Sequence, residues 1–309
     1  MQLHDHINSL GRDLKLRFGE KVHKLSINAQ FTCPNRDGTL GRGGCTFCNN
    51  ASFNARTQTQ ESIREQLENS KHGMRAKRYL AYFQAYTNTY AEVETLRQMY
   101  QEALEVADIV GLCVGTRPDC VPDATLDLLA SYRDQGAEVW LELGLQSAFD
   151  ATLERINRGH NFAAYVDAVK RARARNLKVC THLIIGLPGE APSDSLITLD
   201  RVLEQGCQGL KLHPLHIVRG SQMARQWKRG EIEAIGFDAY VQTAAAMIRN
   251  TPWEVVYHRV TATARRPTLL APDWCDNRWP TFNAIAEHLH LHGGQGSALT
   301  ASAPACARF

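Results

Sequence analysis

The pattern of hydrophobic and polar positions alternates between two periods along most of the chain. Short apolar runs in which every second residue faces the same way predict β-strands, and segments with apolar residues three and four apart predict helices. The expected strands cover residues 21–29, 79–86, 109–114, 138–146, 177–185 and 209–218. The expected helices lie between them, at residues 62–77, 89–107, 123–132, 162–175 and 193–205. Capping boxes, Ser62 with Glu65 and Thr89 with Glu92, mark the starts of the first two helices.

This strand–helix alternation predicts the fold class. Strands joined by helical crossovers lie parallel, and right-handed connections curl such a sheet toward a barrel. The pattern contains six such units, fewer than the eight that close a full barrel. We therefore expect an α/β fold, a partial (β/α)6 TIM-like barrel, over residues 21–222.

Three segments lie outside this predicted core. Residues 1–20 are polar and basic, and we expect them to pack across the barrel bottom or to cap its edge. Residues 223–292 predict a small C-terminal extension, with a helix at 237–250 and a further strand at 253–261. Residues 293–309 are rich in small residues, a composition typical of a disordered tail.

Composition and charge indicate the protein's class and compartment more than its function. Of the 309 residues, 44% are hydrophobic and 22% are charged, which is ordinary for a soluble globular protein. The net charge of +3 is too small to indicate nucleic-acid binding by itself. The start has no apolar run typical of a signal peptide, and no apolar stretch is long enough to span a bilayer. We expect a cytoplasmic protein with no membrane partner.

The candidate chemistry is concentrated in a glycine-rich loop after the first expected strand. Three of the nine cysteines, Cys33, Cys45 and Cys48, lie within it. A C-x2-C turn can point both sulfurs at one inorganic centre. A structural zinc site needs four protein ligands, whereas three cysteines on a 4Fe–4S cluster leave one iron open for another ligand. Because the loop follows a strand, we expect it at the carboxyl-end face of the barrel, where ligands of such folds bind.

The strand at residues 138–146 predicts polar groups inside the barrel. Leu141, Leu143 and Leu145 share the face expected to pack against helices, and Glu142 and Gln146 share the opposite, lumenal face. A buried carboxylate or amide costs several kcal/mol unless it is hydrogen-bonded. The lumen therefore holds either a polar guest or a polar network that satisfies itself.

Three segments carry a family resemblance. Lys24-Leu-Ser-Ile-Asn28, Thr32-Cys-Pro-Asn-Arg-Asp-Gly-Thr39 and Gly43-Gly-Cys-Thr-Phe-Cys48 resemble the YhcC-type radical S-adenosylmethionine (SAM) proteins, which are relatives of the Elp3 and oxygen-independent coproporphyrinogen oxidase groups. The spacing C-x11-C-x2-C differs from the C-x3-C-x2-C that is commonest in that superfamily. The resemblance covers the chain to about Leu291 and implies the partial barrel that radical SAM proteins share.

The resemblance implies a reaction and two cofactors. A 4Fe–4S cluster on Cys33, Cys45 and Cys48 would bind SAM through its open iron. One electron, from a donor such as flavodoxin or ferredoxin, would cleave SAM to a 5′-deoxyadenosyl radical that abstracts hydrogen from an unknown substrate. No motif identifies that substrate.

The resemblance also implies SAM contacts. Gln146 and Arg158 match positions that bind SAM in the relatives, and His182 stands where the oxidases carry a ribose-binding aspartate. No Gly-rich run is present to hold the SAM amino group, so this task is expected of the segment with Thr87 and Asn88. Glu142 is the candidate substitute for a ribose-contacting glutamate. The aromatic of the cysteine turn completes the candidate cofactor-binding set, which is Phe47, Thr87, Asn88, Glu142, Gln146, Arg158 and His182.

Two alternative functions stay open. The first is a tRNA-modifying enzyme like Elp3, which the kinship and a basic strip from Lys170 to Lys178 favour and the nearly balanced charge opposes. The second is a zinc-stabilised binding module without catalysis. Two further cysteines, Cys120 and Cys275, are candidates for a hydrogen-atom donor or a sulfur carrier, whereas Cys113, Cys180 and Cys207 are expected in the core.

Overall fold

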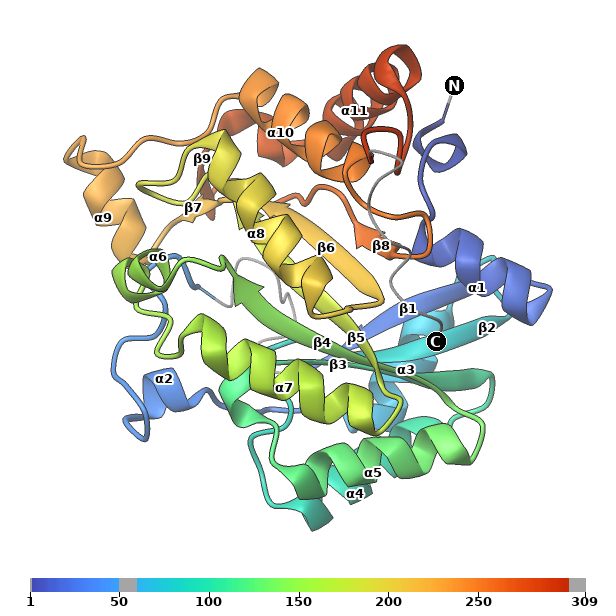
Figure 1. The fold of residues 1–309 in the computed structure, drawn as a ribbon. Coiled ribbons are helices and arrows are strands. Elements are labelled where there is room, and N and C mark those ends of the chain that lie inside the picture. The colour runs from blue at the N-terminus through green and yellow to red at the C-terminus, as the bar shows by residue number, and fades with distance from the viewer. Residues whose placement is uncertain (1, 50–59, 300–309) are drawn as a thin grey trace.

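A computed structural model describes residues 2–49 and 60–299 of the chain. Its centre is a curled sheet of seven parallel strands in the order β1-β2-β3-β4-β5-β6-β8 (Figure 1). The strands have the following bounds: β1 Val22–Ile27, β2 Arg78–Phe83, β3 Ile109–Thr116, β4 Glu138–Gln146, β5 Lys178–Ile185, β6 Gly209–Pro214 and β8 Val256–Arg259. The predicted α/β partial barrel is therefore confirmed.

The seventh strand extends the prediction. The segment expected as an extra strand forms β8, which pairs in parallel with β6, so part of the expected C-terminal extension completes the main sheet. The strand expected at 209–218 is divided, because β6 ends at Pro214, which has no N–H to donate to a sheet. The chain then forms β7 (Ile217–Val218), which pairs antiparallel with β9 (Leu269–Ala271).

Helices cover the outside of the sheet (Figure 1). Along the chain they are α1 Leu10–Phe18, α2 Pro34–Asp37, α3 Ile63–Lys71, α4 Val93–Leu104, α5 Asp123–Asp134, α6 Asp150–Arg155, α7 Phe162–Ala174, α8 Pro192–Glu204, α9 Gln222–Lys228, α10 Phe237–Arg249 and α11 Arg278–His292, with single 3-10 turns at Leu3–Asp5, Pro118–Cys120 and Asp273–Asp276. The capping box of Ser62 and Glu65 is present. The one expected at Thr89 is not, because the Thr89 hydroxyl is buried in a 2.6 Å hydrogen bond with the Thr116 hydroxyl, and α4 begins later.

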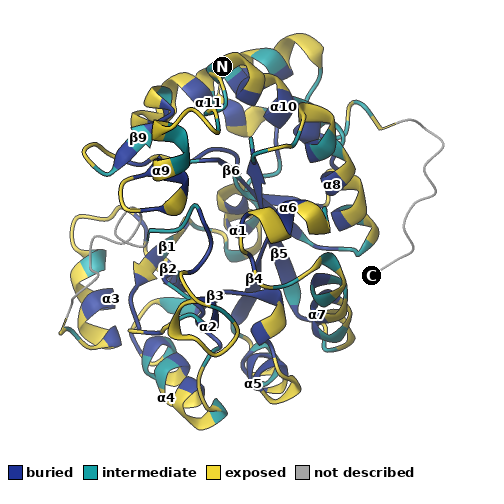
Figure 2. Ribbon diagram, turned by 90° about the vertical axis from the view of Figure 1, so that its left-hand side faces the viewer, coloured by how far each residue is buried: buried dark blue, intermediate teal, exposed yellow. Residues whose placement is uncertain are grey.

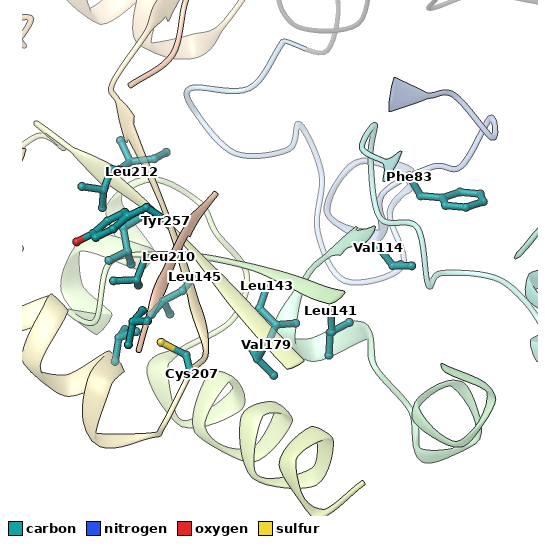
Figure 3. Close-up of a cluster of buried hydrophobic side chains, with 14 of the residues drawn as sticks. Phe83, Val114, Leu141, Leu143, Leu145, Val179, Cys207, Leu210, Leu212 and Tyr257 are labelled. Carbon is teal, nitrogen blue, oxygen red and sulfur yellow. The ribbon is translucent and has the colours of Figure 1, made fainter. Parts of the chain in front are cut away.

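The main core lies between the outer face of the sheet and these helices (Figure 3). Leu141, Leu143 and Leu145 of β4 are fully buried there, on the face predicted from their alternation. Figure 2 shows the same arrangement by burial, with buried strands in the centre and exposed outward faces on the helices. Among the described residues, none of the helices is long and apolar enough to cross a membrane.

A second apolar cluster closes the bottom of the barrel. Leu10 and Leu14 of α1 pack there with Val22 and Trp140, at the end of the lumen opposite the carboxyl ends of the strands. The segment before α1 also completes the sheet edge, because the backbone carbonyl of Asn8 accepts a 2.8 Å hydrogen bond from the N–H of Tyr257 in β8. This end of the lumen is thus covered by packed apolar side chains.

The segment after α11 is ordered as far as residue 299. The side chain of Gln295 accepts a hydrogen bond from the Asn8 N–H at 2.8 Å and donates to the carbonyls of Pro252 at 2.7 Å and Val255 at 2.8 Å. The expected disorder from residue 293 therefore fails for 293–299, because this one glutamine satisfies three backbone groups in two other segments. Residues 300–309 lie outside the described part of the chain.

Candidate functional site

A cavity of about 820 Å³ opens at the carboxyl ends of the strands. Its walls come from the loop after β1 and from strand ends all around the half-barrel, as far as β8. Cys33, Cys45 and Cys48 all line it, on the face predicted for the cysteine loop.

Local hydrogen bonds shape the cysteine loop. The N–H of Cys48 donates to the Cys45 carbonyl at 2.9 Å, which closes the C-x2-C turn. The buried Asn35 donates from Nδ2 to the Asn157 carbonyl at 2.6 Å, and Asn157 donates from its own Nδ2 to the Gly44 carbonyl at 2.8 Å. Gly44 has a φ of 74°, and a Cβ there would come within 2.8 Å of Arg36. The loop is therefore clasped to the segment after α6 and needs glycine at its tightest point.

The three thiols lie close enough to influence one another. Burial, together with the neighbouring thiols of Cys45 and Cys33 and against the opposing charge of Arg36, raises the pKa of Cys48 to about 11. A bound metal favours thiolates and would offset this cost of burial. Among the described residues no fourth cysteine lines the cavity, so the donor set fits a cluster with one open iron better than a four-ligand zinc site.

Two predicted SAM contacts lie beside the cysteines. Arg158, which is 7% exposed, donates from Nη1 to the Cys45 Sγ at 3.3 Å and from Nη2 to the Gly144 carbonyl at 2.6 Å. Gln146 ends β4 with a φ of 81°, an uncommon conformation for a residue with a side chain. A Cβ on Gly144 would come within 2.9 Å of both side chains. The strand end and the later loop thus bring Arg158 and Gln146 to the same wall of the cavity.

The other predicted contacts divide into two groups. Phe47, Thr87 and His182 line the cavity. Asn88 does not, because it is fully buried behind the wall, where its Nδ2 donates to the Gly115 carbonyl at 2.7 Å. Asn88 thus anchors the end of β3 and does not face the cavity.

Glu142 is held by a network inside the lumen. Its carboxylate contacts the Nζ of Lys24, the Nε2 of His182 at 2.7 Å, the Nζ of Lys211 at 3.2 Å and the Nδ1 of His258 at 3.2 Å. Burial alone would raise the pKa of Glu142, but Lys211 and Lys24 hold it well below its usual range. Protein groups thus satisfy the Glu142 carboxylate, whereas the Nε2 of His258 in the same network is buried without a hydrogen-bond partner in the described part of the chain.

This network does not suit a metal ion. Glu142, Cys180 and His258 offer ligand atoms within 4.8 Å of one another. The carboxylate already carries two ammonium groups, however, so a metal cation would be repelled from this point.

Comparison with known proteins decides the family. The model of the radical SAM superfamily matches residues 30–202, and that of the radical SAM C-terminal domain matches residues 207–290. The chain belongs to the radical SAM superfamily. Membership confirms the cofactors predicted from the cysteine loop, a 4Fe–4S cluster and SAM.

Relatives of known sequence agree with this assignment. The chain is 61% identical to Protein YhcC of Escherichia coli (strain K12) over 300 residues, 97% of each chain. It is 38% identical to YtqA of Bacillus subtilis (strain 168) over 292 residues, 93% of this chain and 90% of YtqA. Elongator complex protein 3 of Schizosaccharomyces pombe is 29% identical over 152 residues, 48% of this chain and 27% of that protein.

Solved structures share the radical SAM fold. Elp3 of Methanocaldococcus infernus superposes with a TM-score of 0.61 at 18% identity, covering 89% of this chain and 64% of that one. The protein anSMEcpe, solved with bound AdoMet, superposes with a TM-score of 0.51 at 10% identity, covering 76% of this chain and 64% of that one.

Three charged residues of the radical SAM barrel were not predicted as site residues. They are Lys24, Lys211 and Arg259, and the last two line the cavity. A signal was available for Lys211, since β6 alternates apolar Leu210 and Leu212 with polar Lys211 and His213, as β4 does. The same reasoning that assigned Glu142 to the lumen would have found it.

The other cysteines in the described part of the chain do not line this cavity. Cys113, Cys180 and Cys207 are buried in apolar clusters, as expected. Cys120 is buried, and its pKa is raised to about 12 by that burial and by Asp119. Cys275 is 1% exposed, and burial raises its pKa as well. Neither is an accessible thiolate of the kind that a sulfur carrier requires.

Proposed function

We propose that this chain is a radical SAM enzyme whose 4Fe–4S cluster is held by Cys33, Cys45 and Cys48. The observation that carries the proposal is the placement of these three thiols at one end of a cavity, with Arg158 in contact with Cys45. When bound, the cluster and SAM supply a reductive cleavage that gives a 5′-deoxyadenosyl radical. The substrate from which that radical would take hydrogen is unknown.

The protein's own residues would bind and orient SAM. Arg158 has the planar fork that suits a carboxylate, and Gln146 stands beside it. Thr87 and Phe47 offer a polar and an aromatic wall at the cysteine end, and His182 offers a ring nitrogen farther along. Glu142 would act indirectly, by fixing His182 through the 2.7 Å contact. The sealed barrel bottom would keep water from reaching the reacting groups from below.

A single set of variants tests the proposal. Anaerobic reconstitution of the full chain should give about four irons and four sulfides per chain, the composition of the cluster, and reduction with SAM should release 5′-deoxyadenosine. Serine at Cys33, Cys45 or Cys48 should abolish the cluster, whereas the matched core variant Cys207→Ser should keep it. A full four-iron cluster in Cys45→Ser would show that the ligand assignment is wrong. Zinc in place of iron and sulfide would favour the zinc module.

A second candidate function follows from one comparison. The tRNA uridine(34) acetyltransferase of Dehalococcoides mccartyi is 34% identical over 124 residues, 39% of this chain and 26% of that protein. A tRNA substrate is therefore the alternative. The basic strip lends it little support, because its arginines are paired with carboxylates. Arg171 pairs with Asp123 of α5 and with Asp167 of its own helix, and Arg175 pairs with Asp123 and Asp127 of α5. A salt-sensitive gel shift with tRNA would support this alternative, and its absence would remove it.

An electron donor is the partner that the proposed reaction needs. A flavodoxin or a ferredoxin has the required one-electron chemistry. Reduction of the reconstituted cluster by either protein, in place of dithionite, would test this partner.

A further inference from the structure

The lumenal end of the cavity carries more positive than negative charge. Lys211 and Arg259 are register partners on β6 and β8, so their side chains leave the sheet on the same face. Lys24 and Lys211 both bind the Glu142 carboxylate. The Arg259 guanidinium has no ion pair or hydrogen bond within the described part of the chain. Three cations thus meet one carboxylate.

The histidines nearby do not change this balance at neutral pH. Burial lowers the pKa of His182 to about 4, of His216 to about 4 and of His258 to about 3. Burial also holds the pKa of His213 well below its usual value, and the charge of Arg259 contributes. All four rings are therefore neutral, and the cluster of Lys24, Lys211, Arg259 and Glu142 has a net charge of about +2.

Within residues 2–49 and 60–299, no second acidic side chain forms an ion pair with these cations. Among the described residues that line the cavity there is neither an aspartate nor a glutamate. The Tyr82 ring faces the Nζ atoms of Lys24 and Lys211 at 4.9 and 4.7 Å, and its hydroxyl accepts a 2.5 Å hydrogen bond from Lys211. Burial keeps the pKa of Tyr82 well above its usual value, so the ring offers polar contacts but no negative charge.

Uncompensated charge in a partly buried lumen is costly to the free protein. It persists where a ligand supplies the opposite charge. The fork of Arg259 can bind an oxyanion through two N–H groups, and Lys211 adds a point charge beside it. At about 820 Å³ the cavity is within the range of sites that enclose small molecules, which leaves room for a second ligand beside SAM.

We infer that the Lys211–Arg259 end of the cavity is a binding subsite for an oxyanion group, a carboxylate or a phosphate, of the substrate. This inference rests on the proposed function, because it assigns the opposite end of the same cavity to SAM. It narrows the substrate to molecules that carry a carboxylate or phosphate. This group would lie at the Lys211–Arg259 end while the rest of the molecule extends toward the cysteines.

The test is a titration of the full chain, with its cluster reconstituted, with inorganic phosphate in one arm and succinate in the other. Calorimetry should detect binding of at least one of these anions, and the tighter one identifies the chemistry of the group. Arg259→Gln should weaken this binding at least about tenfold, the loss expected for one charge-assisted contact, and Arg259→Lys should restore part of it. The matched control is Arg97→Gln, which removes an exposed arginine of α4 and should leave anion affinity unchanged.

Thermal melting gives a second readout that a structural role would not produce. Without added anion, Arg259→Gln should melt at the same temperature as the parent or higher, since it relieves repulsion between cations. Phosphate or succinate should raise the melting temperature of the parent but not of this variant. A lower melting temperature together with unchanged anion affinity would assign Arg259 a packing role and overturn the inference.

The inference and the proposed function fail separately. Iron, sulfide and SAM binding report on the cysteine end, and anion binding reports on the Lys211–Arg259 end. Anion affinity lost in Arg158→Gln but retained in Arg259→Gln would place the anion at the cysteine end and overturn the subsite.

Discussion

Arg158 is the residue on which two parts of the site meet. Its guanidinium contacts the Cys45 sulfur and the Gly144 carbonyl, so one side chain ties a cluster ligand to the end of β4. A third group at this fork, the carboxylate of SAM, would find it already oriented. Residues 157–159 are positioned in turn by the Asn35 clasp, so the arginine cannot move independently of the cysteine loop.

The first prediction concerns this arginine. Arg158→Ala should weaken SAM binding about ten- to a hundredfold, because a charge-assisted hydrogen bond contributes about 1.5–3 kcal/mol. Iron content should be retained, since all three thiols remain, and equilibrium titration with SAM measures the effect. The control is Arg155→Ala, an exposed arginine of α6 that contacts the Pro188 carbonyl. Equal SAM affinity in both variants would remove Arg158 from the site.

The second prediction concerns Glu142. Glu142→Gln leaves the ammonium groups of Lys24 and Lys211 without their buried counter-charge, so unfolding in urea should show a loss of about 3–5 kcal/mol. Glu94→Gln removes an exposed carboxylate paired with Arg97 and should change stability by less than about 1 kcal/mol. A loss in Glu142→Gln no larger than in that control would show that the lumenal network adds little to stability.

Residues of the site differ in how well the local sequence predicts their position. The three cysteines and Gln146 lie in short motifs, so local spacing was enough to predict that they face one cavity. Lys24, Lys211 and Arg259 come from three strands that are far apart in the sequence. Their proximity depends on the strand register and on the curl of the sheet. Asn88 lies next to the predicted Thr87 but points behind the wall, which local sequence does not indicate.

Among the elements, β8 and the segment after α11 depend on each other. The N–H of Tyr257 in β8 binds the Asn8 carbonyl, and Asn8 also donates its own N–H to the Gln295 side chain. The two ends of the described chain thus hold the last strand of the sheet in place. The periodic strands and helices were predictable because their apolar faces are continuous, whereas this arrangement depends on single polar contacts between distant segments.

The third prediction tests that arrangement. Gln295→Ala removes three hydrogen bonds of a buried side chain and leaves backbone groups unsatisfied, so it should destabilise the protein by about 1–3 kcal/mol. Scanning calorimetry should show a lower melting temperature by about 2 °C or more. Gln101→Ala, on the exposed side of α4, should melt with the parent. A parent-like melting temperature for Gln295→Ala would show that the contacts of residues 293–299 add little to stability.

For the whole molecule, the buried histidines make stability depend on pH. The folded-state pKa is about 4 for His182 and about 3 for His258, below the ordinary 6.5, because burial opposes their protonation. Between these values the unfolded chain binds more protons than the folded one, so stability falls as the pH is lowered. Glu142 acts in the same direction at lower pH, since its depressed pKa contributes stability that is lost as the carboxylate is protonated.

The fourth prediction follows from this linkage. The free energy of unfolding, measured in urea at a series of pH values, should decrease from about pH 6.5 toward pH 4. The slope should be smaller in His258→Gln, which removes one of these buried neutral rings. A stability that stays constant from pH 7 to pH 4.5 would contradict the burial of neutral histidines.

The apolar cluster at the barrel bottom also affects how ligands enter and leave the cavity. Leu10, Leu14 and Trp140 pack across the lower end, so ligands would enter and leave where the cavity opens, at the carboxyl ends of the strands. Lys211 lies in the middle of β6, whereas the cysteines lie beyond the end of β1, so the charged end is the deeper one. A substrate bound at the charged end would therefore have to bind before SAM and dissociate after it. Steady-state kinetics would then show ordered addition of the two ligands.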